Sequence, residues 1–340
     1  MRGHHRSALF GARALALVAL VAPVTTVGCT VDASDPLAEF GGGFDPLRYD
    51  AGTLAPAALG RPLRVAVPPY YAAGLAAGSA AALERYLESS CGFDVELTAS
   101  TAYDQRVVEL LRSGELDVAE LSPYQYADAR RAHAPLTPFA ATVARGSASY
   151  GSYLVVKAGS TLRTVDDLRG GKRVRLGLVA PLSTSGYALP LLFLLDHGVT
   201  IDGDVELVLT GSHPASLAAL LDGRIDVAAV SSDLLIGSVG LAGPVAVLAK
   251  VGRMPNDVLV ARSDLDTAAL RLIERAFLRL SIHDQEARAA LRAFSPVDGF
   301  MPVPPGHYDE IFALAERAAA LPVPRTRPLE PPAPDAGSPP

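Results

Sequence analysis

One stretch of the chain occurs twice: Leu110-Leu-Arg-Ser-Gly-Glu-Leu-Asp-Val-Ala119 returns, one residue shorter, as Leu220-Leu-Asp-Gly-Arg-Ile-Asp-Val-Ala228. Each copy contains the apolar end of a helix, a glycine that stops it, and a strand that opens with Asp-Val-Ala. A second similar pair, residues 63–67 and 173–178, reads as two buried apolar strands that each begin such a unit. Helix–glycine–strand junctions also resemble one another by chance, but two repeats in the same order favour two related α/β units.

Strand and helix patterns alternate around these repeats. Residues 79–90 and 107–111 carry apolar side chains at helical spacing, and residues 95–97 and 205–209 read as short strands. This alternation predicts an α/β fold with right-handed crossovers, arranged as two similar lobes. Because ligands bind beyond the carboxyl ends of parallel strands, two facing lobes would enclose one cleft.

The composition excludes several classes of protein. Of the 340 residues 49% are hydrophobic and 19% charged, which is typical of a globular chain with a buried core. The formal net charge is −6 without a basic cluster, which argues against nucleic acid as a partner. A bound anion must therefore be held by a few aimed donors. The two cysteines, and His, Asp and Glu residues without metal-ligand spacing, predict no metal site and no cofactor.

The first 29 residues read as an export signal. A basic start precedes the apolar run Ala14-Leu-Ala-Leu-Val-Ala-Leu-Val-Ala22, which is too short to span a bilayer and which Pro23 ends. Val27-Gly28-Cys29 then resembles the lipobox of bacterial lipoproteins, with Thr26 as a departure, which implies lipidation at Cys29. The alternative is an ordinary signal peptide whose cysteine is free or bonded to Cys91.

Composition predicts where the folded part of the chain begins and ends. Residues 30–60 read as a flexible tether, and the proline-dense residues 321–340 as a disordered tail. We expect one lobe to comprise residues 61–145 plus 250–320 and the other residues 146–249. The two hinge crossovers are then expected near 143–150 and 243–252.

Two strand-to-helix turns carry hydroxyl groups. Leu182-Ser-Thr-Ser-Gly-Tyr187 lies between a strand and the apolar helix predicted at 188–195, where free N–H groups and the helix dipole bind anions. Ser183, Thr184 and Ser185 add donors, and Gly186 lets the backbone approach closely. A plain helix cap is the alternative, but a cap needs one hydroxyl and here there are three.

The second turn, Thr210-Gly-Ser-His-Pro214, opens the helix predicted at 215–221. His213 can donate to an anionic oxygen, although a lone histidine at a helix start is more often a cap.

These motifs together resemble the phosphate, phosphite and phosphonate-binding components of bacterial ABC importers, which have the type II periplasmic-binding-protein fold. The most specific match is the Ser-Thr-Ser-Gly loop at 183–186 followed by Gly211-Ser-His213. The other matching segments are Val65-Ala-Val-Pro-Pro-Tyr-Tyr71, Gly114-Glu-Leu-Asp-Val-Ala-Glu-Leu-Ser-Pro-Tyr-Gln-Tyr126, Asp167-Leu-Arg-Gly-Gly-Lys172 and Met254-Pro-Asn-Asp257.

The resemblance implies the ligand contacts. Ser183, Thr184, Ser185 and His213 would hold the oxyanion, with Tyr126 from the other lobe and Tyr70 or Tyr71 from the first loop. Asp233 and Asp257 match acidic positions that meet a ligand amine in some members, with a helix cap and a turn residue as the alternatives. Ser122 replaces the family's usual glycine and Pro68-Pro69 is doubled, which leaves the ligand's substituent open.

The implied protein is a monomeric, exported binding protein, attached to a membrane by a lipid, that delivers its ligand to an ABC permease and ATPase and catalyses no reaction. Two other classes are weighed against it. A serine-type hydrolase lacks support because no Gly-x-Ser-x-Gly elbow is present. A sensor domain for a membrane signalling partner would use the same fold. Sulfonate, nitrate or a thiamine precursor are other possible ligands on this fold, and the serine loop counts against them.

Overall fold

The computed structural model describes residues 59–67, 77–99, 103–171, 173–235, 243–285, 287–294 and 297–330. The predicted signal peptide with Cys29, nearly all of the tether, Tyr70 and Tyr71, and residues 331–340 lie outside the described residues.

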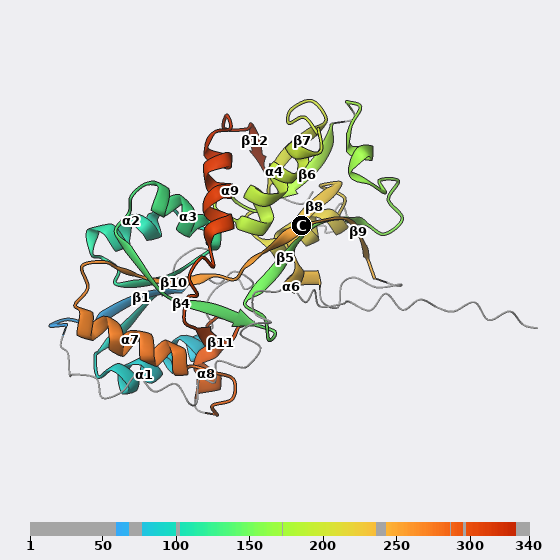
Figure 1. The fold of residues 1–340 in the computed structure, drawn as a ribbon. Helices are drawn as coiled ribbons and strands as arrows, with labels where there is room; N and C mark the ends of the chain where they lie inside the picture. The colour runs from blue at the N-terminus through green and yellow to red at the C-terminus, as the bar shows by residue number, and fades with distance from the viewer. Residues whose placement is uncertain are drawn as a thin grey trace, which may run out of the picture.

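The described chain forms two lobes, each built on a six-stranded sheet (Figure 1). The first sheet has the strand order β11-β4-β10-β3-β1-β2. Its strands are β1 (Leu63–Val67), β2 (Val95–Ala99), β3 (Val118–Leu121), β4 (Leu136–Ala144), β10 (Val258–Arg262) and β11 (Val297–Met301). The second sheet has the order β12-β7-β6-β8-β5-β9. Its strands are β5 (Ser149–Lys157), β6 (Val174–Leu178), β7 (Val205–Leu209), β8 (Val227–Ser231), β9 (Val245–Pro255) and β12 (Thr326–Pro328).

The sequence repeat corresponds to a structural repeat. β1 lies parallel between β2 and β3, and β6 lies in the same way between β7 and β8. In each lobe the aspartate of Asp-Val-Ala accepts a backbone N–H from the second residue of the central strand. Arg64 in β1 donates to Asp117, and Arg175 in β6 donates to Asp226, each at 2.9 Å. The prediction of two similar α/β lobes is therefore confirmed.

Helices cover both faces of each sheet. Those of the first lobe are α1 (Ala77–Cys91), α2 (Arg106–Ser113), α3 (Pro123–Arg131), α7 (Thr267–Arg279) and α8 (Ala287–Leu291). Those of the second are α4 (Leu189–Asp196), α5 (His213–Leu221) and α6 (Ser232–Leu235), with a 3-10 turn at Val165–Leu168 and a π-helical turn at Thr184–Ala188. α1 and α7 pack against the first sheet around Phe277, and α4 packs against the second sheet around Leu176.

The chain passes directly between the sheets twice. β4 leads into β5 through residues 145–148, as predicted, and β9 leads into β10 through residues 256–257. The second crossover was predicted at 243–252, but β9 continues to Pro255 because it pairs along β5 as far as Ser149. Residues 250–255 therefore belong to the second lobe, which corrects the predicted boundary.

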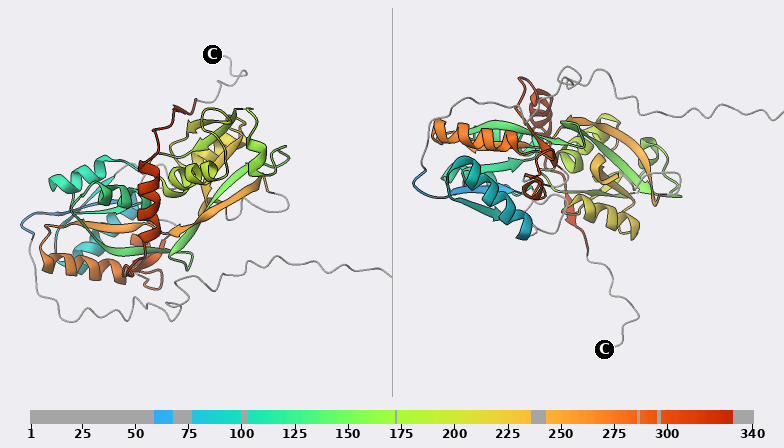
Figure 2. Two further views of the ribbon diagram at one scale, coloured as in Figure 1. Left: turned by 45° about the horizontal axis from the view of Figure 1, so that its top comes forward. Right: turned by 90° about the horizontal axis from the view of Figure 1, so that it is seen from below.

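A third connection follows β11. α9 (Asp309–Ala319) lies between the lobes, against α3 on one side and α4 on the other (Figure 2). Beyond it β12 pairs in parallel with β7, and Arg327 forms an ion pair with Glu206. The prediction of a disordered tail from residue 321 is thus wrong for residues 326–328. Proline density did not prevent strand pairing, because the open edge of β7 supplies hydrogen-bonding groups.

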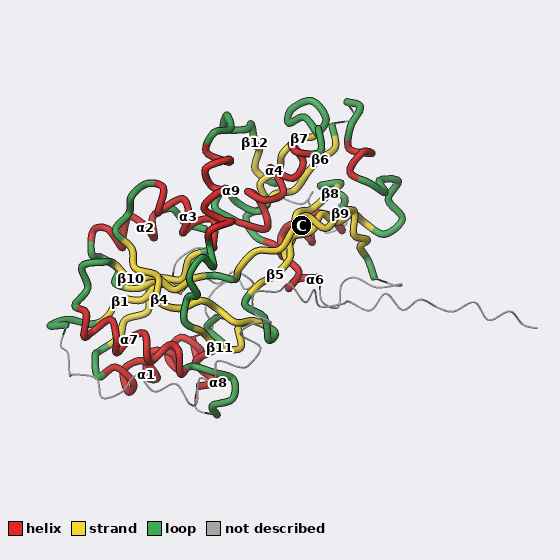
Figure 3. The backbone as a smooth tube through the Cα atoms, in the orientation of Figure 1, coloured by secondary structure: helices red, strands yellow, loops and turns green. Residues whose placement is uncertain are grey.

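In both lobes helices flank the strands, and loops join them (Figure 3). Within the described ranges, none of the helices is both long enough and apolar enough to cross a membrane.

Candidate functional site

The hydroxyl-rich turn after β6 begins a helix in an unusual way. The Ser183 side chain accepts the N–H of Gly186 at 3.1 Å, as a helix cap does. The next turn is π-helical, with the N–H of Leu189 donating to the carbonyl of Thr184, and regular α4 begins only at Leu189. Such widened turns often occur at functional sites. Gly186 is required for close packing, because a Cβ there would lie 2.4 Å from Cγ2 of Val179.

The turn lies at the boundary between the lobes. Ser183, Thr184 and Ser185 are no more than 1% exposed. Part of what covers them is the start of α3 in the other lobe: Ser122 Oγ donates to the carbonyl of Leu182 at 2.7 Å, and the N–H of Tyr124 donates to Thr184 Oγ1 at 2.9 Å. The turn therefore faces the opposite lobe, and neither bulk water nor the interior of its own lobe.

His213 starts α5 beside this turn and is 1% exposed. Its Nε2 lies 3.3 Å from Ser185 Oγ, and its Nδ1 accepts the N–H of Ser231 at 3.3 Å. Burial lowers the pKa of His213 to about 4, against the opposing effect of the Ala229 backbone, so the ring is neutral at neutral pH. The turn therefore meets a neutral imidazole.

Two tyrosines complete the polar surroundings of the turn. The hydroxyl of Tyr103, from the loop before α2, lies near Ser183, and that of Tyr150, from the start of β5, lies near Ser185 and Thr184. Burial is the main cause that raises the pKa of both phenols, which stay protonated and can donate. Ser152 Oγ in turn donates to the carbonyl of Ser185 at 2.8 Å and fixes the turn to β5.

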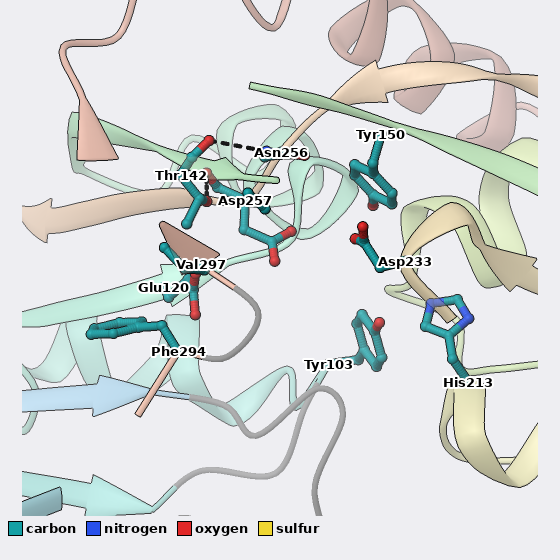
Figure 4. A pocket seen from close by; sticks show the side chains of 11 residues that line it. Tyr103, Glu120, Thr142, Tyr150, His213, Asp233, Asn256, Asp257, Phe294 and Val297 are labelled. Carbon is teal, nitrogen blue, oxygen red and sulfur yellow. Dashed lines mark hydrogen bonds between the residues drawn. The ribbon is translucent and has the colours of Figure 1, made fainter. Parts of the chain in front are cut away.

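A cavity opens next to these groups between the lobes (Figure 4). It contains about 460 Å³ of free space, its open mouth included. The described residues that line it are Tyr103, Glu120, Thr142, Ala144, Tyr150, His213, Asp233, Asn256, Asp257, Phe294 and Val297.

Three carboxylates line this cavity. Glu120 in β3 and Asp257 before β10 come from the first lobe, and Asp233 in α6 comes from the second (Figure 4). Burial, and then the charge of Asp233, raises the pKa of Asp257 to about 8. Burial, and then the charge of Asp257, also raises the pKa of Glu120 well above its ordinary value. A cation placed among these groups would relieve their mutual repulsion.

Hydrogen bonds from side chains to backbone carbonyls hold the crossover next to Asp257. Thr142 Oγ1 donates to the carbonyl of Asp257 at 2.6 Å, and Asn256 Nδ2 donates to the carbonyl of Thr142 at 3.1 Å. The Tyr308 hydroxyl donates to the carbonyl of Asn256 at 3.0 Å. Asn256 Nδ2 also donates to the carbonyl of Ser147 at 2.8 Å, so the backbone next to Asp257 is tied to the first crossover.

The structure brings most of the predicted residues together, and Tyr126 lies apart from them. His213, Asp233 and Asp257 line the cavity, whereas the three hydroxyl residues lie behind the side chains that line it. Tyr126 does not line it: its ring packs in the first lobe against Tyr308 and Phe312, at centroid distances of 5.7 and 5.6 Å. That face of α3 is turned toward the core, and the ligand contact by Tyr126 stays a prediction.

Sequence reasoning missed Glu120, Tyr103 and Tyr150. Glu120 has a signal in hindsight, since it is a charged residue inside the apolar strand Val118–Leu121. The tyrosines carry no local pattern. Tyr103 adopts a positive φ of 62°, which is uncommon for a bulky side chain and depends on tertiary surroundings. Among the described residues no group of three His, Cys, Asp or Glu side chains is arranged to hold a metal ion.

Comparison with known proteins gives a consistent result. Residues 65–308 match the family described as "ABC transporter, phosphonate, periplasmic substrate-binding protein". Over 154 residues the chain is 29% identical to the phosphate-import protein PhnD of Mycolicibacterium smegmatis, covering 42% of this chain and 47% of that one. The match thus spans about half the length of this curated relative.

Solved structures share the fold at low sequence identity. PhnD1 of Prochlorococcus marinus in complex with methylphosphonate superposes with a TM-score of 0.64 at 18% identity, covering 77% of this chain and 99% of that chain. A binding protein component of an ABC phosphonate transporter (PA3383) from Pseudomonas aeruginosa gives 0.63 at 20% identity, covering 76% and 88%. These likenesses confirm the predicted type II periplasmic-binding-protein fold. Since the family match extends through both lobes, the chain belongs to the periplasmic substrate-binding proteins of phosphonate ABC transporters.

Proposed function

We propose that this protein binds a phosphonate-like small oxyanion (a phosphonate, phosphite or phosphate) outside the cytoplasm and delivers it to an ABC permease and ATPase. The observation that carries the proposal is the buried Ser-Thr-Ser turn with His213, which faces the opposite lobe beside a cavity. The names of the relatives, a phosphate-import protein and a protein in complex with methylphosphonate, agree with this ligand class.

In this proposal the oxyanion binds at the end of the cavity next to the turn, beside His213, Tyr103 and Tyr150. Ser183, Thr184 and Ser185 donate hydroxyl hydrogens, Gly186 leaves the backbone accessible, and Nε2 of His213 donates a ring hydrogen. The donors are neutral at neutral pH, because burial keeps the imidazole uncharged. Several aimed neutral donors in a partly dry site can hold an anion without a positive field. Tyr70 and Tyr71 are proposed to approach from the first loop.

The opposite end of the cavity favours a cationic substituent. Asp233, Asp257 and Glu120 are close enough that their charges raise the pKa of Asp257 and Glu120. An ammonium group would pair with these carboxylates through charge-assisted hydrogen bonds. We therefore favour an aminoalkylphosphonate over an unsubstituted anion.

Ligand binding is proposed to stabilise a closed arrangement of the lobes. Thr184 already meets Tyr124 across the lobe boundary, so the serine turn is placed where closure brings both lobes to the ligand. The crossovers at 145–148 and 256–257 are the hinges in this scheme.

Two other functions are disfavoured by particular observations. In a serine–histidine hydrolase, a carboxylate accepts a hydrogen bond from the second ring nitrogen of the histidine. Here that nitrogen accepts the backbone N–H of Ser231, and the low pKa of His213 makes the ring a poor base. A sensing role would use the same closure of the lobes. Copurification decides between the two roles: a permease as the partner supports transport, and a membrane kinase supports sensing.

The membrane anchor is proposed to be a lipid on Cys29. Substitution Cys29→Ser is expected to move the protein from the membrane fraction to the released fraction and to abolish incorporation of labelled palmitate. Cys91→Ser serves as the control, because Cys91 is buried in the first lobe and its thiol faces the carbonyl of Leu272. Retention of the label in Cys29→Ser would disprove the anchor. The protein is expected to be a monomer by light scattering.

The ligand class is tested by a thermal-shift panel with phosphate, phosphite, methylphosphonate, 2-aminoethylphosphonate and alkylsulfonates. A ligand that binds only the folded state raises the melting temperature. At a ligand concentration one hundred times Kd, it adds about 2.7 kcal/mol to the free energy of unfolding. We expect a rise with at least one phosphorus oxyanion and none with sulfonates. A rise with sulfonates alone would refute the proposal.

A further inference from the structure

A tight turn joins β4 to β5 at the first crossover. The backbone groups of Ala144 and Ser147 hydrogen-bond to each other across it, at 2.9 and 3.0 Å. The two residues between them, Arg145 and Gly146, have φ values of 53° and 71°. A two-residue turn with both central residues in the left-handed region favours Gly, Asn or Asp at each position. Arginine is thus an unfavourable residue for this backbone.

The Arg145 side chain reaches toward the cavity from that turn. Its Nε lies 3.3 Å from Oδ1 of Asp233, with the arginine side chain 44% exposed and the aspartate side chain 14% exposed. Asp233 itself lines the cavity on the side of His213, opposite Glu120 and Asp257 (Figure 4). The guanidinium therefore supplies a positive charge behind one of the three carboxylates.

None of the described residues that line the cavity is Lys or Arg. Arg145 does not line the cavity itself. Its ion pair with Asp233 nevertheless places a guanidinium next to the acidic end of the cavity, which is formed by Glu120, Asp233 and Asp257. The guanidinium repels an ammonium group of a ligand at this end and attracts the ligand's anionic group.

We propose that Arg145 is a specificity-determining residue that sets the preference of the cavity between ligands with and without a cationic substituent. The proposal rests on the proposed function and names a residue that acts on the same site. Arg145 partly satisfies Asp233, so the cavity accepts an unsubstituted phosphonate despite its acids. Loss of the guanidinium removes the positive charge beside Asp233, whose carboxylate then attracts a ligand's ammonium and repels its oxyanion more strongly.

The two kinds of ligand respond in opposite directions. Without Arg145, methylphosphonate is expected to bind about 5-fold more weakly and 2-aminoethylphosphonate about 5-fold more tightly, the scale of a partly exposed charge pair. A merely structural role would weaken both ligands together and leave their ratio unchanged.

The test is calorimetric titration of both ligands into the wild type and three variants. Arg145→Asn removes the charge with a residue that tolerates a positive φ, so folding is preserved. Arg145→Lys keeps the charge and is expected to retain the wild-type ratio. Arg253→Asn removes a positive charge from β9, where Arg253 hydrogen-bonds Ser149 at the crossover, and is also expected to leave the ratio unchanged.

The outcomes separate the two proposals. If the wild type binds either ligand and Arg145→Asn leaves the affinity ratio unchanged, the inference on Arg145 is overturned while the proposed function stands. The same holds if Arg253→Asn shifts the ratio as much as Arg145→Asn does. If the wild type binds neither ligand, nor any phosphorus oxyanion, the proposed function is wrong and the inference falls with it.

Discussion

The acidic end of the cavity makes a quantitative prediction about stability and pH. The pKa of Asp257 is raised from 3.8 to about 8, first by burial and then by the charge of Asp233. Its carboxyl therefore keeps a proton in the folded protein over a range in which the unfolded chain has lost it. Asp257→Asn removes this titration while it preserves the shape of the side chain.

The sign and size follow from proton linkage. Between pH 5 and pH 7 the folded state holds one more proton at Asp257 than the unfolded state, so its stability falls as pH rises. Each pH unit costs about 1.4 kcal/mol, or about 2.7 kcal/mol across the two units. This loss begins above the unfolded pKa and is complete above the folded pKa. Glu120 adds a slope of the same sign, since its pKa is also raised.

The assay is urea unfolding at pH 5, 6 and 7. The free energy of unfolding of Asp257→Asn minus that of the wild type is expected to rise by about 1.4 kcal/mol per pH unit. Asp204→Asn is the control: hydrogen bonds, chiefly from Thr200, lower the pKa of Asp204 to about 2, so its effect is constant over this range. A flat difference for Asp257→Asn would show that Asp257 is ionised in the folded protein, and the argument for a dry acidic end would fail.

Two further predictions concern the serine turn. Ser185→Ala and His213→Ala are each expected to weaken oxyanion binding about 10- to 100-fold by calorimetry, because a buried hydrogen bond to an anion is lost while the fold remains; wild-type affinity in both would mean that the site is misplaced. Gly186→Ala is expected to lower the free energy of unfolding by about 1–3 kcal/mol, since its Cβ would lie 2.4 Å from Cγ2 of Val179. Gly78→Ala in α1 meets no atom within 4 Å, and is expected to stabilise the helix instead; urea unfolding of both variants compares them, and equal effects would contradict the packing argument.

Much of the fold could be read from local patterns. The strands at 63–67 and 205–209 were predicted with the bounds that the structure has, because buried parallel strands are short apolar runs between clear stop signals. The paired Asp-Val-Ala segments identified the two lobes, and Asp117 and Asp226 make equivalent backbone contacts.

In the candidate site too, the sequence indicated the residues that form a local pattern and missed those that only the tertiary fold brings in. Ser183–Ser185 and His213 stand out because a strand-to-helix turn concentrates donors within a few residues. Tyr126 packs against Tyr308 and Phe312, which the sequence did not indicate, since spacing along a helix identifies its faces but does not say which face meets the core. Tyr103 lies far from the turn in sequence, and only the tertiary fold brings its hydroxyl to Ser183.

By itself, the sequence determined the two α/β units, and it predicted an export signal and a turn that binds an oxyanion, since each of these depends on residues that are neighbours along the chain. Only the tertiary structure decided that Glu120, Asp233 and Asp257 share one cavity, that Arg145 reaches Asp233, and that residues 326–328 complete a sheet. The physical reason is that charge pairing and the pairing of sheet edges act through space. They join segments that are far apart along the chain, and no local sequence pattern indicates that these segments meet.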